Sequence, residues 1–189
     1  EKPIALKLAD AERMVQAGCM DNPAVDYVFG LHVMTYIPTG TVEIRYGKLN
    51  ASSASVRITI HGRSSHGAYP EKGVDAIVAS AHVIAALQTL ASRNISPLNS
   101  AVLSFGKIVG GEVGNALADE VTLTGTLRTL DPATRELCDR RIEEIATKTA
   151  EAFGARAEVQ IRSGYKPLIN NDEVVKVIEE TGAELLGRE

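Results

Sequence analysis

The sequence predicts an α+β fold built around a βαββαβ unit, with a four-stranded antiparallel sheet and two helices on one face. Two observations lead to this fold class. Four segments are predicted as strands, at 56–61, 101–109, 120–130 and 157–161. Apolar and polar residues alternate in the first and in the last two, and a period of two is typical of half-buried strands. Apolar residues at helical spacing follow the first and third of these segments. This order over about 110 residues is ferredoxin-like.

Both helices of this unit have separate sequence signals. Residues 74–92 place apolar side chains at helical spacing, which gives a stripe wide enough to lie on a sheet. Asp131-Pro132 starts the second helix, because Asp caps free amides and Pro has no N–H to leave unpaired. Gly154 is suited to end it. Ahead of the unit, the Gly-, Asn- and Ser-containing run at 47–53 predicts a linker.

Four more elements are expected outside this unit. A short helix is predicted over 10–18 and a final helix over 172–186. Residues 25–33 are β-rich and almost continuously apolar, which is typical of a strand covered on both faces. Residues 40–46 alternate, which predicts a second strand.

These outer elements do not make a domain of their own. We therefore expect residues 1–49 and 166–189 to be two stubs of a neighbouring α/β domain, with residues 50–165 inserted as a compact unit. The chain begins on Glu1 without Met and stops just after a predicted helix. We expect it to be the central portion of a longer protein.

Composition narrows the class of protein. The formal net charge is −4 and no block of Lys and Arg occurs, which argues against a nucleic-acid partner. We identify no apolar run of the roughly 18 residues that a membrane span requires and no secretory leader, so we expect a cytoplasmic protein without a membrane partner. Cys19 and Cys138 lie far apart without a C-x-x-C pattern, which predicts two structural thiols, each buried or half-buried.

Histidines are the first candidates for chemistry. His66 lies in a Ser-Ser-His-Gly turn between a predicted strand and helix, and it is either a loop-stabilising imidazole or a site residue. His32 ends a predicted buried strand, where it either bonds to backbone or ligates a metal. We expect a solvated role for His61 and helix packing or a surface position for His82.

Two further residues carry binding chemistry. Asn115 lies in the glycine-rich run 110–115, which is either a plain hairpin or a loop that lets backbone approach a ligand. Arg128 ends a predicted strand, and its planar fork suits a carboxylate held by two hydrogen bonds. A surface ion pair is the alternative for Arg128.

Together these segments resemble the M20 metallopeptidase and amidohydrolase family, in its aminoacylase, hippurate hydrolase and auxin-conjugate hydrolase branch. Order and spacing agree from about Ala11 to Pro167. The matching motifs are Asp26-Tyr-Val-Phe-Gly-Leu-His32, Ser65-His66-Gly-Ala-Tyr-Pro70 with Gly73-Val-Asp75, Gly110-Gly111 with Gly114-Asn115, and Gly125-Thr-Leu-Arg128.

The resemblance implies a two-domain amidohydrolase that cleaves the amide bond of N-acyl amino acids or small peptides. A catalytic domain would hold two divalent metal ions, zinc in most relatives, with manganese, cobalt or nickel as alternatives. The inserted βαββαβ unit would be a lid that forms a homodimer through an edge strand. By the same likeness His32 would be a metal ligand, His66 would stabilise the oxyanion in the partner's site, and Asn115 and Arg128 would bind substrate.

Several departures from the family pattern limit this expectation. The amino-terminal His-x-Cys or His-x-Asp ligand motif, the Glu-Glu pair and the late carboxy-terminal His are not matched in this sequence. Glu71 stands where many relatives have a second histidine. We therefore expect an incomplete binuclear site and no activity from the isolated chain. The alternative function is a non-catalytic βαββαβ module for dimerisation or small-molecule sensing.

Overall fold

A computed structural model describes residues 8–187. The chain divides into two compact units. One unit spans Tyr46–Asn170, and the described residues 8–45 and 171–187 make up the other. We call the first the lid unit and the second the flanking unit, and each is described by itself.

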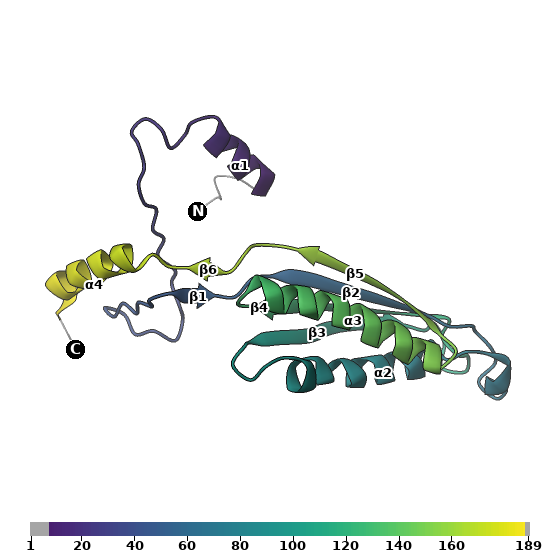
Figure 1. Cartoon of the computed structure of the whole chain (residues 1–189). Helices are drawn as coiled ribbons and strands as arrows, with labels where there is room; N and C mark the ends of the chain where they lie inside the picture. Colours follow the sequence, from purple (N-terminus) through teal and green to yellow (C-terminus); the bar gives the residue numbers. More distant parts are fainter. Residues whose placement is uncertain (1–7, 188–189) are drawn as a thin grey trace. The chain divides into compact units, whose positions relative to one another are not determined.

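The lid unit contains the predicted four-stranded antiparallel sheet. Its strands are β2 (Ala54–His61), β3 (Ala101–Gly110), β4 (Glu120–Thr129) and β5 (Arg156–Ser163), in the spatial order β3-β4-β2-β5. Every neighbouring pair is antiparallel, and α2 and α3 cover the same face (Figure 1). This arrangement confirms the predicted βαββαβ fold class, with β2 and β4 in the centre and β3 and β5 at the edges.

Local capping sets the two helices of the lid. Helix α2 (Ala76–Leu87) begins after Asp75, whose Oδ1 accepts hydrogen bonds from two backbone amides of the first turn. Helix α3 (Pro132–Ala152) begins after Asp131, whose Oδ1 accepts from the Thr134 amide at 2.8 Å. The helix predicted over 74–92 is present as the helical stretch Ala76–Asn94, in which a π turn, η2 (Leu90–Asn94), follows α2.

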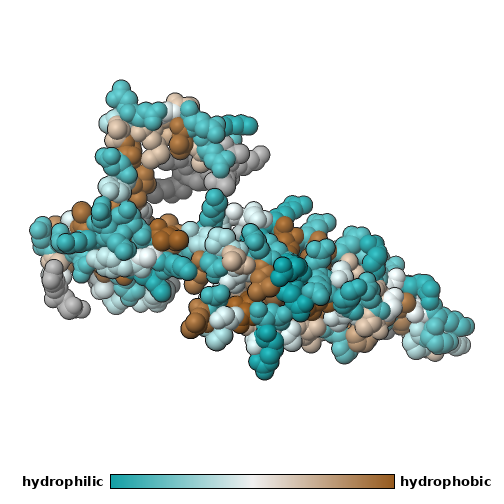
Figure 2. All heavy atoms as spheres, in the orientation of Figure 1, coloured by the Kyte–Doolittle hydropathy of each residue, from teal (hydrophilic) through white to brown (hydrophobic). Residues whose placement is uncertain are grey.

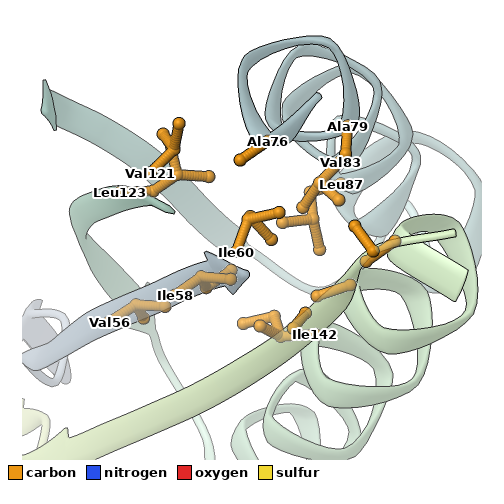
Figure 3. Packing of buried hydrophobic residues seen from close by; sticks show 14 of the residues in the cluster. Val56, Ile58, Ile60, Ala76, Ala79, Val83, Leu87, Val121, Leu123 and Ile142 are labelled. Atoms are coloured by element: carbon orange, nitrogen blue, oxygen red, sulfur yellow. The ribbon is translucent and has the colours of Figure 1, made fainter. Parts of the chain in front are cut away.

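The core lies between the sheet and the two helices (Figure 3). Alternate residues of β2 are fully buried, which is the period expected of a strand covered on one face. Each buried Val, Leu or Ile side chain contributes about 1.5–3 kcal/mol through its removal from water. The labelled side chains that meet in this core are Val56, Ile58, Ile60, Ala76, Ala79, Val83, Leu87, Val121, Leu123 and Ile142.

One helical stretch of the described chain, Ala76–Asn94, is long and apolar enough to cross a membrane by length and composition alone. No apolar run of this length was expected from the sequence, and that single expectation was wrong. The composition has a local explanation, since Ala79, Val83 and Leu87 are buried in the core of the lid.

A short two-stranded antiparallel sheet, which the sequence did not predict, adjoins the four-stranded sheet along the chain. Strand β1 (Lys48–Asn50) lies inside the expected linker and pairs with β6 (Leu168–Ile169). The Asn170 amide also donates to the Gly47 carbonyl at 2.8 Å. The two ends of the lid unit therefore run side by side (Figure 1). Strands of two and three residues are too short for alternation to reveal them.

The flanking unit contains α1 (Leu8–Gln16) and α4 (Asp172–Leu186), close to the predicted helices. The predicted strands at 25–33 and 40–46 are wrong, because neither segment is a strand in this structure. A strand requires a hydrogen-bonded neighbour, and the described residues supply none for either segment. Four apolar residues of the 25–33 segment are 74–85% exposed: Val28, Phe29, Leu31 and Val33. Figure 2 shows hydrophobic side chains along the segment that follows α1.

Candidate functional site

The loop that carries His66 is held by close backbone contacts. It follows β2 and contains a short turn, η1 (Pro70–Lys72), at the end of the sheet away from β1 and β6 (Figure 1). Arg63 and Val74 exchange backbone hydrogen bonds across its base, at 2.9 and 2.8 Å. A Cβ atom on Gly62 would lie 2.2 Å from the Val74 carbonyl oxygen, so only glycine fits there. The loop geometry is therefore set by backbone packing.

The ring of His66 is exposed, and its tautomer is fixed by a hydrogen bond. The Ala68 amide donates to Nδ1 of His66 at 3.1 Å. Since Nδ1 accepts, the proton of the neutral ring resides on Nε2. Nε2–H is therefore a donor available to a developing negative charge.

Asn115 lies beside His66. The Gly67 amide donates to the Asn115 carbonyl at 2.8 Å, and His66 forms an isolated β-bridge with Ala116. A Cβ atom on Gly67 would lie 3.1 Å from the same carbonyl oxygen, so this close approach favours glycine. The structure brings together two of the predicted site residues on one loop pair.

Arg128 lies at the opposite end of the lid sheet. His61, the last residue of β2, pairs with Glu120, whereas Arg128 is eight residues further along β4, opposite Val102 of β3. Eight residues of extended strand span about 27 Å, and His66 lies beyond the His61 end. One lid unit therefore cannot bring His66 and Arg128 to the same small molecule.

The sequence did not single out a partner for Arg128. Its Nη1 donates to the hydroxyl oxygen of Tyr165 at 2.5 Å, and its guanidinium carbon lies 5.7 Å from the centre of that ring. Tyr165 is 37 residues away in the chain. Only the fold brings the two residues together, so no local sequence signal could have found the pair.

His32 has the opposite tautomer to His66. It is exposed in the flanking unit, and its Nδ1 lies 2.8 Å from the Val33 carbonyl oxygen. Because a carbonyl only accepts, Nδ1 carries the proton and Nε2 carries the lone pair that a metal ligand needs. Its donor chemistry fits zinc, but residues 8–187 hold no group of three or more His, Cys, Asp or Glu that could bind a metal ion.

The other two histidines, His61 and His82, contact side chains of the lid unit itself. His61 is half-buried, with Nδ1 3.3 Å from Glu120 and Nε2 3.7 Å from Glu158, so it forms a cross-strand ion-pair group when protonated. The ring of His82 stacks on Phe153 at 4.3 Å between centres, which agrees with the packing role expected for it.

Comparison with known proteins places these residues in a family context. The profile described as the peptidase dimerisation domain of the M20 family matches residues 50–154, more than half of the chain. The N-acetyl-L-cysteine deacetylase of Bacillus subtilis is 36% identical over 91% of this chain and 41% of its own length. The N-acyl-L-amino acid amidohydrolase of Geobacillus stearothermophilus is 40% identical over 86% of this chain and 44% of its own.

Solved structures agree with the sequence matches. A protein of methicillin-resistant Staphylococcus aureus, proposed to be an aminohydrolase, superposes with a TM-score of 0.79 at 30% identity over 92% of this chain and 46% of its own. A dinuclear metal-binding M20 peptidase of Bacillus subtilis gives 0.68 at 25% identity, over 93% and 43%. The chain thus spans less than half the length of the relatives it matches. On this basis, the chain belongs to the M20 family of peptidases and amidohydrolases and contains its dimerisation domain.

Proposed function

We propose that this chain supplies the dimerising lid and one metal-binding histidine of a metal-dependent amidohydrolase that cleaves N-acyl amino acids or small peptides. Relatives named for N-acetyl-L-cysteine and N-acyl-L-amino acids support this substrate class. The structural observation that supports it best is the separation of His66 from Arg128 within one lid unit. A substrate that meets both must be bound by two copies of the chain.

The roles follow from the donor atoms of each residue. Arg128 would hold the free carboxylate of the substrate through two parallel N–H···O bonds. His66 of the second copy would donate Nε2–H to the oxyanion that forms when the amide carbonyl is attacked. Asn115, beside that His66, would supply amide donors and acceptors to the same substrate.

His32 would be one ligand of the metal centre, through Nε2. Bound divalent ions would polarise the amide carbonyl and lower the pKa of a bound water. We propose two such ions, with zinc as the first candidate, by likeness to the dinuclear relative.

The β3 edge is the surface that best fits a second copy. Val102, Ile108 and Val109 of β3 are 53–56% exposed, and Ile77 and Val78 of α2 are nearly half exposed. The other edge, β5, exposes polar and charged side chains at Arg156, Glu158, Gln160 and Arg162. Charged side chains on an edge strand discourage pairing, whereas exposed apolar ones favour it. We therefore propose that two β3 edges form the homodimer.

A mixing experiment tests the shared site directly. The intact protein, meaning the complete amidohydrolase that contains this chain, is prepared as two variants, His66→Ala and Arg128→Gln. We expect each variant alone to be nearly inactive on an N-acetyl amino acid. A heterodimer of the two contains one site with both residues intact and one with neither. Random reassociation of equal amounts should therefore restore about a quarter of the wild-type activity.

Two results would contradict the proposal. If the mixture is no more active than the separate variants, while mass spectrometry shows that heterodimers have formed, His66 and Arg128 do not serve one site. If the wild-type protein with added zinc, manganese, cobalt or nickel hydrolyses no N-acyl amino acid or small peptide, the amidohydrolase function itself is wrong.

A further inference from the structure

Tyr165 follows β5, and its backbone is held by hydrogen bonds to Ser53, the residue just before β2. The Ser53 amide donates to the Tyr165 carbonyl at 3.0 Å, and the Gly164 amide donates to the Ser53 carbonyl at 2.8 Å. These bonds continue the β2–β5 pairing beyond its last register pair, Ala54 and Ser163. A Cβ atom on Gly164 would lie 3.0 Å from the Ser53 carbonyl oxygen, so this approach favours glycine.

The neighbour of Arg128 is tied to the same segment. The Ser52 amide donates to the Thr129 carbonyl at 2.8 Å, and the two side-chain hydroxyls are also 2.8 Å apart. Ser52 is 6% exposed and Thr129 is 1% exposed, so this contact is shielded from water. Consecutive residues, Ser52 and Ser53, thus join the backbones that carry Arg128 and Tyr165 in one hydrogen-bonded block.

The side chains of the pair meet across this block. Arg128 Nη1 donates to the Tyr165 hydroxyl, and the guanidinium also lies near the face of the ring. A free arginine loses much rotamer freedom when a ligand orders it, and a side chain that is already held loses less. With Nη1 engaged, Nε and Nη2 remain as a parallel pair of donors, which matches a carboxylate.

We propose that Tyr165 is a positioning residue that holds Arg128 in the orientation required for a substrate carboxylate. This inference rests on the proposed function, because it takes Arg128 to be the carboxylate-binding residue. It adds a determinant of specificity: Tyr165 favours substrates with a free carboxylate next to the scissile amide, and it has no effect on substrates that lack one.

The test compares an N-acetyl-L-amino acid with its carboxamide in the intact, metal-loaded protein. Tyr165→Phe should raise KM for the acid about tenfold, since a hydrogen bond to a charged group is lost, and leave its kcat within about twofold. Its kinetics on the carboxamide should not change. In the Arg128→Gln background the same change should have no further effect, because the two residues act as one unit. Lys166→Ala, a neighbouring change in the same segment, should match wild type.

A second measurement does not depend on turnover. The Nε–Hε signal of Arg128 is assigned by its loss in Arg128→Gln and followed by NMR as N-acetylglycine is added. Tyr165→Phe should change this signal and raise the half-saturating concentration about tenfold. An unchanged signal and titration, or equal KM changes for acid and carboxamide, would overturn the positioning role. If the wild type hydrolyses neither substrate, the proposed function fails, and the NMR result still decides whether Tyr165 orders Arg128.

Discussion

The Ala68 amide donates to Nδ1 of His66, two residues earlier in the same turn, at 3.1 Å. The ring hydrogen bonds of His66 and His32 distinguish these two histidines, both of which were predicted from the sequence to be site residues. Nε2 of His66 presents a proton, whereas the bond from Nδ1 of His32 to the Val33 carbonyl leaves a lone pair at its Nε2. An oxyanion requires a donor and a metal ion requires a lone pair, so each tautomer suits the role proposed for it.

We predict that His66→Ala mainly lowers kcat. Removal of one oxyanion donor costs about 10²–10³ in kcat, and KM should change little because the charge develops only in the transition state. Steady-state kinetics on an N-acetyl amino acid measure both constants. His82→Gln is the matched control, since His82 stacks on Phe153. A rise in KM without loss of kcat would assign His66 to substrate binding instead.

We predict that Val109→Asp on β3 converts the dimer into a monomer. Val109 is 55% exposed on the edge strand, and an aspartate there would be buried without a partner at the proposed interface. Light scattering after size exclusion gives the mass directly. Gln160→Asp places the same charge on the β5 edge and should leave the dimer intact. A dimer that survives the first change, or dissociates with the second, would remove the β3 edge as the interface.

Local signals in the sequence were sufficient for the elements that depend on local chemistry. Asp131-Pro132 predicts the start of α3 because a cap and a first-turn proline act within one turn. The alternation of β2 likewise shows which face is buried. Residues 25–33 have a strand-like composition, but a strand forms only beside another strand, and composition does not provide the neighbour. The contact of Arg128 with Tyr165 depends on how β5 returns past β2, which no single segment encodes.

We predict that only one of the two cysteines reacts with a thiol reagent in the native protein. Burial raises the pKa of Cys138 to about 11, so its thiol stays protonated below that pH and is not the reactive thiolate. Cys19 is exposed. For this 189-residue chain, titration with a chromogenic disulfide near neutral pH should count one thiol, and two after denaturation. Cys19→Ser should abolish the native reaction, and a native reaction that persists would mean that Cys138 is accessible.

Our last prediction concerns the acid stability of the lid. Hydrogen bonds from the Thr134 amide and side chain lower the pKa of Asp131 from its usual 3.8, so the folded state binds this proton less tightly than the unfolded state. The stabilisation is therefore complete above the unfolded pKa and is lost as the pH falls through the folded one. Asp131→Asn keeps a capping oxygen but carries no charge. Between about pH 5 and pH 3 at low salt, thermal melts should show a larger loss of Tm in wild type than in Asp131→Asn. Equal losses would show that the carboxylate contributes no pH-dependent stability.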